Sequence, residues 1–476
     1  MTTQFGIYFG NTTIALAFYK DGKTEVISND SGDRLTPAVV AYNQNEFITG
    51  MAAKASLTHN ATGTVINNKR LFNDQLTDEE LEQTAVGMPC AVTVNNGNVT
   101  YTFNSSNKSA TPDDIATHLF KKMYSIAFNI VQSNNIKVVV SVPLYFSQSV
   151  RQRVWDCLEN AGFSVLQLIS EPSAAALAYR LDESDNSKVL VYRVGGVSCD
   201  ATILQIHNGL YEILATVHYP NLGGNYFTKL LAEYIAKEFF NRWKLDPHES
   251  KKSMYKLTRH SELAKHILST KTSTSLFIES LCDGIDWEQN ITRPRFENLI
   301  SPHMQKYIEP IKECLAKANL TSVTKIIFCG GSTRIPKLQS VIRGSLSADI
   351  EVFDDKPDEI IAEGCARQAS LLESPYDHDD LSLDVPLLAN DVYVCDSNSK
   401  VVKVHIPSRT PLPTKITFTE SDSKAFEYSI FEGSIENDEH ILDKISFTNA
   451  GCEQSAADFQ VVITQDKITM NLIETC

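Results

Sequence analysis

The chain has 476 residues, too many for one hydrophobic core, and this length predicts two or three domains. A net charge of −15 argues against direct binding to nucleic acid, and no apolar stretch is long enough to span a membrane. The ten cysteines form no Cys-x-x-Cys pair, and no basic, apolar leader opens the chain. We therefore expect a cytoplasmic (cytosolic) protein with reduced thiols, no zinc cluster and no membrane partner.

Residues 1 to about 374 alternate strand and helix patterns, as α/β domains do. Phe5 to Phe9 and Ile14 to Phe18 are apolar runs on either side of a glycine turn, which predicts a strand-turn-strand unit. Thr111 precedes a proline and two acids, and this order predicts the start of a helix. Val138 to Pro143 predicts a buried strand, and a second helix is expected from Ser147 onward.

The pattern changes near the C-terminal end of this α/β region. Residues 375–385 are polar and acidic, which predicts a linker. Residues 386–476 then contain short β patterns and no convincing long amphipathic helix, so we expect a small, strongly acidic β domain. Its expected strands are Lys400 to Ile406, Lys415 to Thr419, Phe426 to Phe431 and the stretch Phe459 to Met470.

Three strands of the α/β region run into glycine turns. The segments Gly6 to Thr13 and Val191 to Ser198 resemble each other, and Ile326 to Cys329 ends at Gly330-Gly331 just before a helix. A glycine turn at a helix N-terminus can present backbone N–H groups to a phosphate. One such turn more often only connects two elements, but three in order favour a nucleotide-binding site.

The string Gly-Gly-Ser-Thr-Arg-Ile-Pro-Lys, from Gly330 to Lys337, resembles the adenosine-binding loop of the 70-kDa heat-shock chaperone family. Paired glycine hairpins face each other across the nucleotide in the superfamily that this family shares with actin and sugar kinases. The resemblance implies an actin-like, two-lobed ATP-binding domain over residues 1–374. It also implies a truncated, lidless β-sandwich of the substrate-binding type after the linker, similar at Pro413-Thr414-Lys415 to that family's entry into its sandwich.

The resemblance also implies the phosphate end of the site. Lys69 matches the catalytic lysine, Glu171 matches the glutamate that holds the water shell of the metal, and Asp200 follows the second phosphate loop. An isolated Lys-Arg pair is ordinarily a solvated surface feature, so the role of Lys69 depends on its register with the flanking residues. The implied phosphate loops contribute Gly10, Asn11, Thr12, Gly195, Gly196 and Ser198.

A helix around Glu262 resembles the family's adenosine-gripping helix. By this resemblance Glu262 and Lys265 contact the ribose, while Ser269 and Arg334 frame the adenine. His266 stands where the family has arginine, and an imidazole can also stack on a base. The alternative is a solvated Glu262–Lys265 salt bridge of no functional importance. The third turn supplies Gly330, Gly331 and Ser332.

Two departures from the family determine the expected activity. Tyr8 and Arg193 replace two aspartates that, in the family, orient the hydrated magnesium and the attacking water. Since phosphoryl transfer depends on positioning and charge compensation, we expect ATP hydrolysis to be slow or absent. We expect Mg²⁺ to be weakly required or not required, with Arg193 free to pair with phosphate. The alternative is that Arg193 swings out to solvent and leaves a weakened site.

Within the family, these features resemble the atypical heat-shock-70-like subunit of the ribosome-associated complex. That resemblance implies a chaperone or co-chaperone with a J-domain protein partner. It also implies indirect association with ribosomes, weak contact with nascent or unfolded polypeptide and no direct nucleic-acid binding. Two alternatives stay open: an active ATP-hydrolysing folding chaperone whose hydrated magnesium is held by Asp200 and Glu171, and a small-molecule kinase of the actin-like superfamily.

Overall fold

The structure is a computed structural model, and its chain divides into two compact units, residues 1–383 and 384–476. It describes residues 4–20, 22–74, 76–103, 108–181, 187–207, 210–373, 391–397, 401–406, 414–421, 425–432, 441–448, 456–463 and 468–473. The predicted linker and the prolines of 407–413 lie outside the described residues. No helix in this described part of the chain is both long and apolar enough to cross a membrane.

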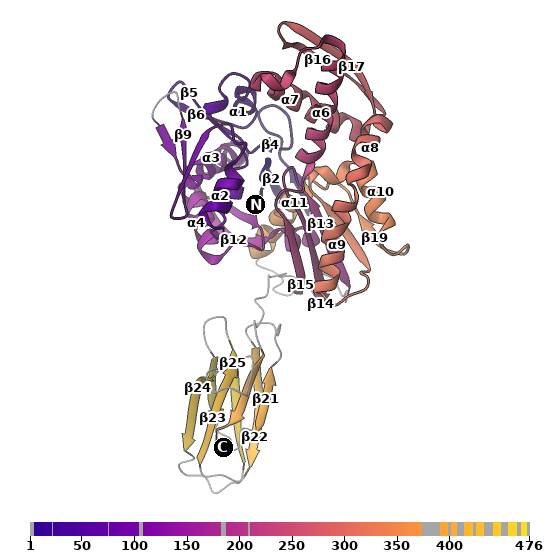
Figure 1. Cartoon of the computed structure of the whole chain (residues 1–476). Helices are drawn as coiled ribbons and strands as arrows, with labels where there is room; N and C mark the ends of the chain where they lie inside the picture. Colours follow the sequence, from indigo (N-terminus) through magenta and orange to yellow (C-terminus); the bar gives the residue numbers. More distant parts are fainter. Residues whose placement is uncertain are drawn as a thin grey trace. The chain divides into compact units, whose positions relative to one another are not determined.

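The first lobe of the larger unit is built on a sheet with strand order β12-β11-β1-β2-β3. The sheet strands are β1 (Gln4–Phe9), β2 (Thr13–Lys20), β3 (Lys23–Val26), β11 (Ile136–Val142) and β12 (Phe163–Ser170), with β4 (Thr36–Pro37) paired to β2. Its helices are α3 (Pro112–Val131), α4 (Gln148–Asn160), α5 (Glu171–Ala178) and α11 (Ile360–Glu373). Figure 1 shows two of these helices, α3 and α4, on the left of the view. A peripheral layer adds β5 (Val40–Asn43), β6 (Glu46–Thr49), α1 (Met51–Ser56), η1 (Ala61–Gly63), β7 (Thr64–Val65), η2 (Asn68–Phe72), α2 (Asp78–Ala85), β8 (Ala91–Asn95), β9 (Asn98–Phe103) and β10 (Lys108–Ala110).

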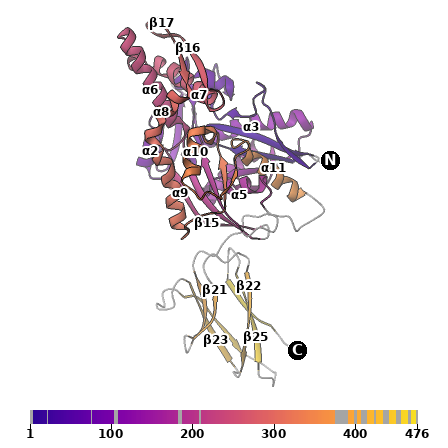
Figure 2. The same ribbon diagram turned by 90° about the vertical axis from the view of Figure 1, so that its right-hand side faces the viewer.

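The second lobe is built on a sheet with strand order β15-β14-β13-β18-β19. These strands are β13 (Lys188–Val194), β14 (Cys199–His207), β15 (Leu210–Tyr219), β18 (Lys325–Cys329) and β19 (Glu351–Phe353). Figure 2 shows its helices α8, α9 and α10 along one side of the unit. The remaining elements are α6 (Gly224–Trp243), η3 (Pro247–Glu249), α7 (Lys251–Thr270), β16 (Ser273–Cys282), β17 (Ile285–Thr292), α8 (Arg293–Ile300), η4 (Ser301–His303), α9 (Gln305–Lys317), η5 (Gly331–Arg334) and α10 (Pro336–Gly344).

The two lobes repeat one topology. In each, the first strand pairs antiparallel with the second and parallel with a later strand, β11 in one lobe and β18 in the other. The similarity of the two glycine segments therefore reflects a duplicated hairpin, β1-β2 and β13-β14. Tyr8 and Arg193 are each the second-to-last residue of the first strand of their hairpin. The two departures from the family thus occupy equivalent positions in the two lobes.

Local signals in the sequence explain where the elements begin. Thr111 and Asp114 form a capping box at the start of α3, where Pro112 is the first helical residue. Ser147 caps α4 by accepting a hydrogen bond from the Val150 N–H. Strand β11 is almost wholly buried, as its unbroken apolar run predicts for a parallel strand. These elements confirm the predicted α/β class and the expected actin-like arrangement of two lobes.

Helices α5 and α11 pack closely enough to need glycine. A Cβ on Gly364 of α11 would lie 1.8 Å from the Ala174 carbonyl oxygen of α5, and one on Gly6 of β1 would lie 2.0 Å from the Ala366 nitrogen. Both helices belong to a buried apolar cluster that also includes strand residues of both lobes, such as Val139 and Val191. This shared core fixes one lobe against the other, so side chains that face each other across the cleft are held in register.

The smaller unit is a sandwich of two antiparallel sheets, ordered β21-β20-β23-β24 and β22-β25-β26. Its buried core joins the two, with Val394 from one sheet and Phe459 from the other. The prediction of a single strand pattern from Phe459 to Met470 was wrong. The stretch contains the last residues of β25 and the first residues of β26, and these two strands pair antiparallel. The strands are β20 (Val392–Asp396), β21 (Val402–Ile406), β22 (Thr414–Ser421), β23 (Ala425–Glu432), β24 (Ile441–Thr448), β25 (Ala456–Ile463) and β26 (Ile468–Ile473).

Candidate nucleotide-binding site

The two hairpin turns are closed by equivalent backbone hydrogen bonds and touch each other. The Gly10 N–H donates to the Thr13 carbonyl at 3.0 Å, and the Gly195 N–H donates to the Ser198 carbonyl at 2.9 Å. A Cβ on Gly196 would lie 2.4 Å from Cγ2 of Thr12, so a residue larger than glycine does not fit there. The predicted first and second phosphate loops are therefore brought together at the base of the cleft.

The third glycine turn packs onto the second. Gly330 has a φ of 82°, a conformation that favours glycine, and a Cβ there would meet the Val194 carbonyl oxygen at 2.4 Å. Ser332 Oγ donates to the Gly195 carbonyl at 2.9 Å. Gly331 begins a short 3₁₀ turn, and helix α10 starts only at Pro336. All three predicted loops thus converge on one place.

Arg193 is buried and joins the two lobes. It is 5% exposed, so the alternative in which its side chain swings out to solvent is wrong. Its Nε lies 3.0 Å from Oε2 of Glu171, across the cleft on α5, and its Nη2 pairs with Asp200 on the neighbouring strand β14. Nη2 also donates to Ser198 Oγ at 3.0 Å. The arginine therefore holds both carboxylates that the family resemblance assigned to the catalytic centre.

Lys69 completes this buried charge cluster. Its Nζ lies 2.5 Å from Oε1 of Glu171 and donates to the Phe9 carbonyl, also at 2.5 Å. The lysine is 2% exposed, which makes a solvated surface role wrong for it. Lys69 and Arg193 thus neutralise Glu171 and Asp200, and the cluster carries two positive and two negative groups.

The pKa shifts in the cluster follow from this pairing. Burial opposes the charge of Asp200, but Arg193 and His218 together lower the pKa of its carboxyl below the ordinary value. Burial likewise opposes the charge of Arg193, yet Asp200 and Glu171 raise its pKa well above the usual range. For Lys69 burial outweighs the attraction of Glu171 and lowers its pKa. The first two groups are therefore held in their charged forms.

The residues present do not suit a magnesium ion. Both expected carboxylates already bind a guanidinium, and the position in β1 equivalent to Arg193 carries Tyr8, whose hydroxyl accepts from Arg193 Nη1 at 3.4 Å. Burial raises the pKa of Tyr8, so its hydroxyl stays neutral. Among the described residues, no group of three or more His, Cys, Asp or Glu side chains is arranged to hold a metal ion. A bound dication would face a fixed positive charge.

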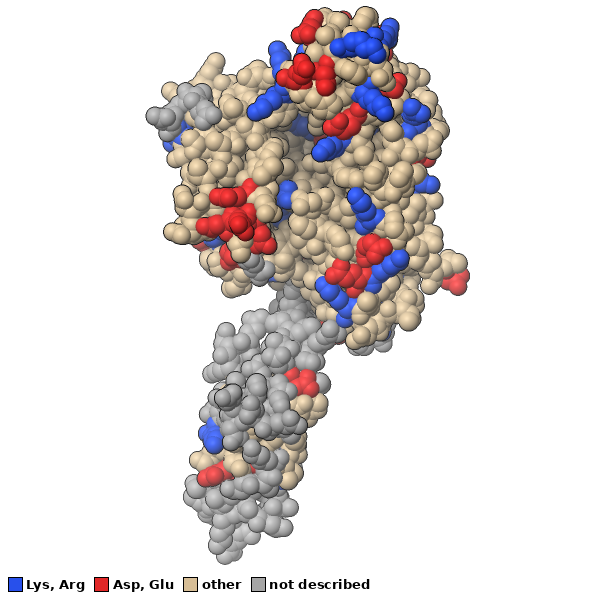
Figure 3. Space-filling view, in the orientation of Figure 1, with Lys and Arg blue, Asp and Glu red and all other residues tan. Residues whose placement is uncertain are grey.

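Nucleotide binding is better supported by the same geometry. Asn11 is 7% exposed, and its buried Oδ1 has no hydrogen-bond partner within the part of the chain that the structure describes. It lines a pocket of about 260 Å³ together with Ser198 of the second loop and Arg70. Figure 3 shows a hollow between the lobes in this region. A polar pocket at converging glycine loops is the kind of environment that phosphate groups occupy.

The helix predicted to contact adenosine, α7, forms polar contacts with both α1 and α6. Glu262 forms a salt bridge with Lys54 of α1 across the cleft at 2.8 Å, and the alternative Glu262–Lys265 salt bridge is not found among the described residues. Lys265 is buried and donates to the Gly224 carbonyl at 3.1 Å and to Thr228 Oγ1 at 2.9 Å. Burial lowers its pKa to about 8. These bonds hold α7 against α6.

The other predicted adenosine contacts are also placed by bonds within the protein. Arg334 donates through Nε to Oδ1 of Asp358 at 3.0 Å, which fixes the plane of its guanidinium. Ser269 is partly buried and donates to the Lys265 carbonyl at 3.0 Å, while His266 is exposed. Glu262, Lys265, His266 and Ser269 share one helix, and Arg334 lies on the third glycine turn.

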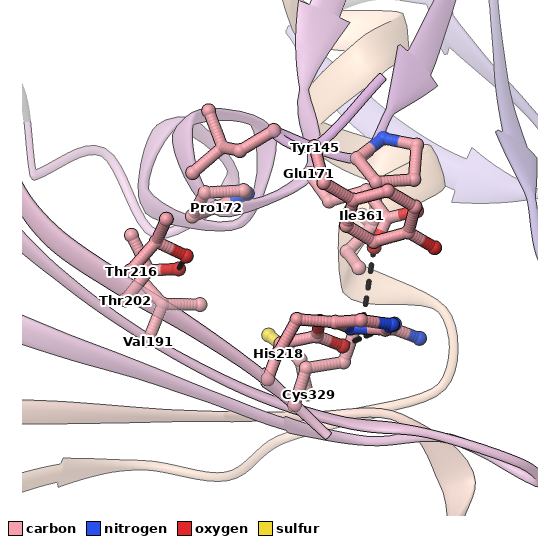
Figure 4. Close-up of a pocket in the computed structure, with 13 residues that line it drawn as sticks. Tyr145, Glu171, Pro172, Val191, Thr202, Thr216, His218, Cys329 and Ile361 are labelled. Atoms are coloured by element: carbon pink, nitrogen blue, oxygen red, sulfur yellow. Dashed lines mark hydrogen bonds and ion pairs between the residues drawn. The ribbon is translucent and has the colours of Figure 1, made fainter. Parts of the chain in front are cut away.

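Sequence reasoning missed two residues of this centre, Tyr145 and His218. The His218 Nδ1 lies 2.5 Å from Oδ1 of Asp200, and its ring lies against that of Tyr145 with centroids 4.3 Å apart (Figure 4). Both residues line the pocket of about 260 Å³ and a second pocket of about 110 Å³ beside Glu171. The only signal in the sequence was a histidine six residues before Gly224, which by itself indicates nothing.

Comparisons with known proteins agree with this architecture. The family model described as Hsp70 protein matches residues 4–454. Heat shock 70 kDa protein 14 of Homo sapiens is 37% identical over 424 residues, covering 86% of this chain and 83% of the relative. The protein of the same name from Danio rerio is 39% identical over 426 residues, covering 86% and 84%. The two-lobed domain, the three glycine loops and these matches together mean that the chain belongs to the Hsp70 family.

Proposed function

We propose that this Hsp70-family, chaperone-like protein binds ATP with little or no need for Mg²⁺ and hydrolyses it slowly or not at all. One observation carries the proposal: Arg193 lies between Glu171 and Asp200, where a hydrated dication would have to be held. A fixed guanidinium can also compensate the charge of a phosphate. It cannot rearrange its ligands around an attacking water as a hydrated metal does, and this is the reason to expect slow turnover.

The nucleotide then acts mainly as a structural ligand. The loop turns at Gly10 and Gly195 belong to opposite lobes, so one nucleotide bound between them ties the lobes together. A ligand that binds only the folded state stabilises it by mass action. We propose that the bound form serves as a stable surface for a partner and does not undergo a rapid ATPase cycle.

The proposed partner is a J-domain protein, and the proposed place of action is the nascent chain at the ribosome. This rests on the resemblance to the atypical subunit of the ribosome-associated complex. The charge of the chain supports an indirect route, because a net charge of −15 opposes direct contact with ribosomal RNA. Figure 3 shows an acidic patch over α2, whose first turn contains Asp78, Glu79 and Glu80.

The nucleotide part is tested with the purified full chain and γ-labelled ATP. Bound ATP per chain and released phosphate are measured under single-turnover conditions, in EDTA and in Mg²⁺. We expect retained ATP in both solutions and little phosphate release. Fast, Mg²⁺-dependent release would overturn the proposal and favour the active chaperone ATPase. Failure to retain ATP in EDTA would overturn the metal-independent site.

The partner part needs a separate experiment. The full chain is sedimented with salt-washed ribosomes, alone and with a ribosome-bound J-domain protein. We expect it in the ribosome pellet only when the J-domain protein is present. Sedimentation of the chain alone would contradict indirect binding, and no sedimentation in either case would contradict the ribosomal role without affecting the nucleotide result.

A further inference from the structure

The imidazole of His218 is oriented by a carboxylate, as the imidazole of a catalytic histidine often is. His218 is the second-to-last residue of β15, directly opposite Asp200 of β14 in the antiparallel register, and its Nδ1 lies 2.5 Å from Oδ1 of that aspartate. A carboxylate only accepts hydrogen bonds, so this contact places the proton of a neutral imidazole on Nδ1. The other nitrogen, Nε2, is then a free acceptor. No hydrogen bond to Nε2 is found among the described residues.

The surroundings of the ring fix its direction. Tyr145 covers one face, with the two ring planes inclined by 37°, and the side chain of His218 remains 27% exposed (Figure 4). The charged groups that line the smaller pocket with it are Asp200, Arg193 and Glu171, and Arg70 and Glu80 line the larger pocket. Asp200 is shared, because Arg193 occupies its other oxygen. The carboxylate therefore cannot turn away from the histidine without breaking a buried ion pair.

The two pockets beside His218 have room for water. Their volumes are about 110 and 260 Å³, and both are lined by His218 and Tyr145. One ordered water needs on the order of 10–15 Å³ of such space, so the pockets that His218 lines can hold several. The larger pocket also contains Asn11 and Ser198 from the two phosphate loops. Water beside His218 is thus close to the place where the terminal phosphate of a bound nucleotide is expected.

We infer that the Asp200–His218 pair is a proton acceptor for slow ATP hydrolysis in this chain, in place of the missing aspartates. In the step, the oxygen of a water attacks the γ-phosphorus while one of its protons moves to Nε2 of His218. The bond between the γ-phosphorus and the β–γ bridging oxygen breaks, and ADP leaves with that electron pair. Lys69 and Arg193 supply the positive charge, and His218 then returns the proton to solvent.

This inference rests on the proposed function, because ATP must occupy the same cleft, and it selects slow hydrolysis over none. A positioned general base contributes about 10²–10⁴ in rate. The histidine is not implied by the family resemblance. It comes only from the contact that the fold makes between β14 and the end of β15.

The test is single-turnover phosphate release by the full chain. We expect His218→Ala to release phosphate at least about 100-fold more slowly than the wild type, and added imidazole to restore part of the rate through the space left behind. His218→Gln, which keeps a donor for Asp200 but has no basic nitrogen, should be equally slow and not restored. The matched control is His248→Ala, since His248 also contacts an aspartate, Asp246, but lies on the surface far from the loops. Its rate should not change.

A second measurement does not depend on turnover. In a ¹⁵N-histidine NMR spectrum, the signal that disappears in His218→Gln should be that of an Nδ1-protonated ring, and it should move when a non-hydrolysable ATP analogue binds. An Nε2-protonated ring, unchanged rates in both His218 variants, or no phosphate release by the wild type would each overturn the inference. Bound ATP is quantified in the same samples, so loss of retention in EDTA separately identifies failure of the proposed function.

Discussion

Replacing Arg193 by aspartate should make the stability of the larger unit depend on Mg²⁺. The side chain is 5% exposed and pairs with both Glu171 and Asp200. Removing one partner of a buried ion pair typically costs about 3–5 kcal/mol, and the new carboxylate adds repulsion. In EDTA we therefore expect Arg193→Asp to lower the free energy of unfolding by at least about 3 kcal/mol. The variant then presents three carboxylates, a set that suits a hydrated dication.

Added Mg²⁺ should restore much of this loss. A ligand at 100 times its dissociation constant stabilises the folded state by about 2.7 kcal/mol. The assay is denaturant unfolding followed by tryptophan fluorescence, because the three tryptophans, Trp155, Trp243 and Trp287, all belong to the larger unit. The wild type should unfold at the same denaturant concentration in Mg²⁺ and in EDTA.

Two controls separate the metal effect from general damage. Arg343 forms an exposed pair with Asp354, so Arg343→Asp should cost at most about 1 kcal/mol and show no Mg²⁺ dependence. Arg193→Met removes the cation without adding a carboxylate and should regain less stability in Mg²⁺ than Arg193→Asp. The reasoning fails if Mg²⁺ stabilises the wild type, or if Arg193→Asp is as stable as the wild type in EDTA.

Three further results are expected. The folded-state pKa of Asp200 lies below its ordinary value, so the stabilising effect of its ion pair is complete above about pH 4 and is lost as the pH falls through the lower folded-state pKa. The difference in unfolding free energy between the wild type and Asp200→Asn should therefore be smaller at about pH 3 than at about pH 6. The same difference at both pH values would contradict the pairing. Gly196→Ala should weaken ATP retention at least about tenfold, about 1.4 kcal/mol, because its Cβ meets Thr12, and adding Thr12→Ala should recover part of it. A double-mutant cycle on Lys54 and Glu262 should give a salt-sensitive coupling energy of about 0.2–1 kcal/mol, and the variants should release nucleotide faster than the wild type. Zero coupling at low salt would refute a salt bridge across the cleft.

The local features of this fold were predictable because they depend on neighbours in the sequence. The capping box at Thr111, the buried strand β11 and the glycine turns all follow from side-chain size, periodicity and backbone freedom within a few residues. Chain reversal inside Phe459 to Met470 was missed because two adjoining apolar runs read as one. Membership of the Hsp70 family also followed from local strings.

The tertiary structure alone decided what the unusual residues do. By sequence Arg193 was an arginine in place of an aspartate, with a side chain pointing to solvent as the alternative. Its partner Glu171 comes from the other lobe, 22 positions earlier. Lys265 reaches the Gly224 carbonyl of α6, where the absence of a side chain on Gly224 leaves room for its ammonium group. The contact between His218 Nδ1 and the Asp200 carboxylate forms only because β15 pairs with β14. Charges act through space, and the distances that decide their energy are set by packing between elements far apart in the chain.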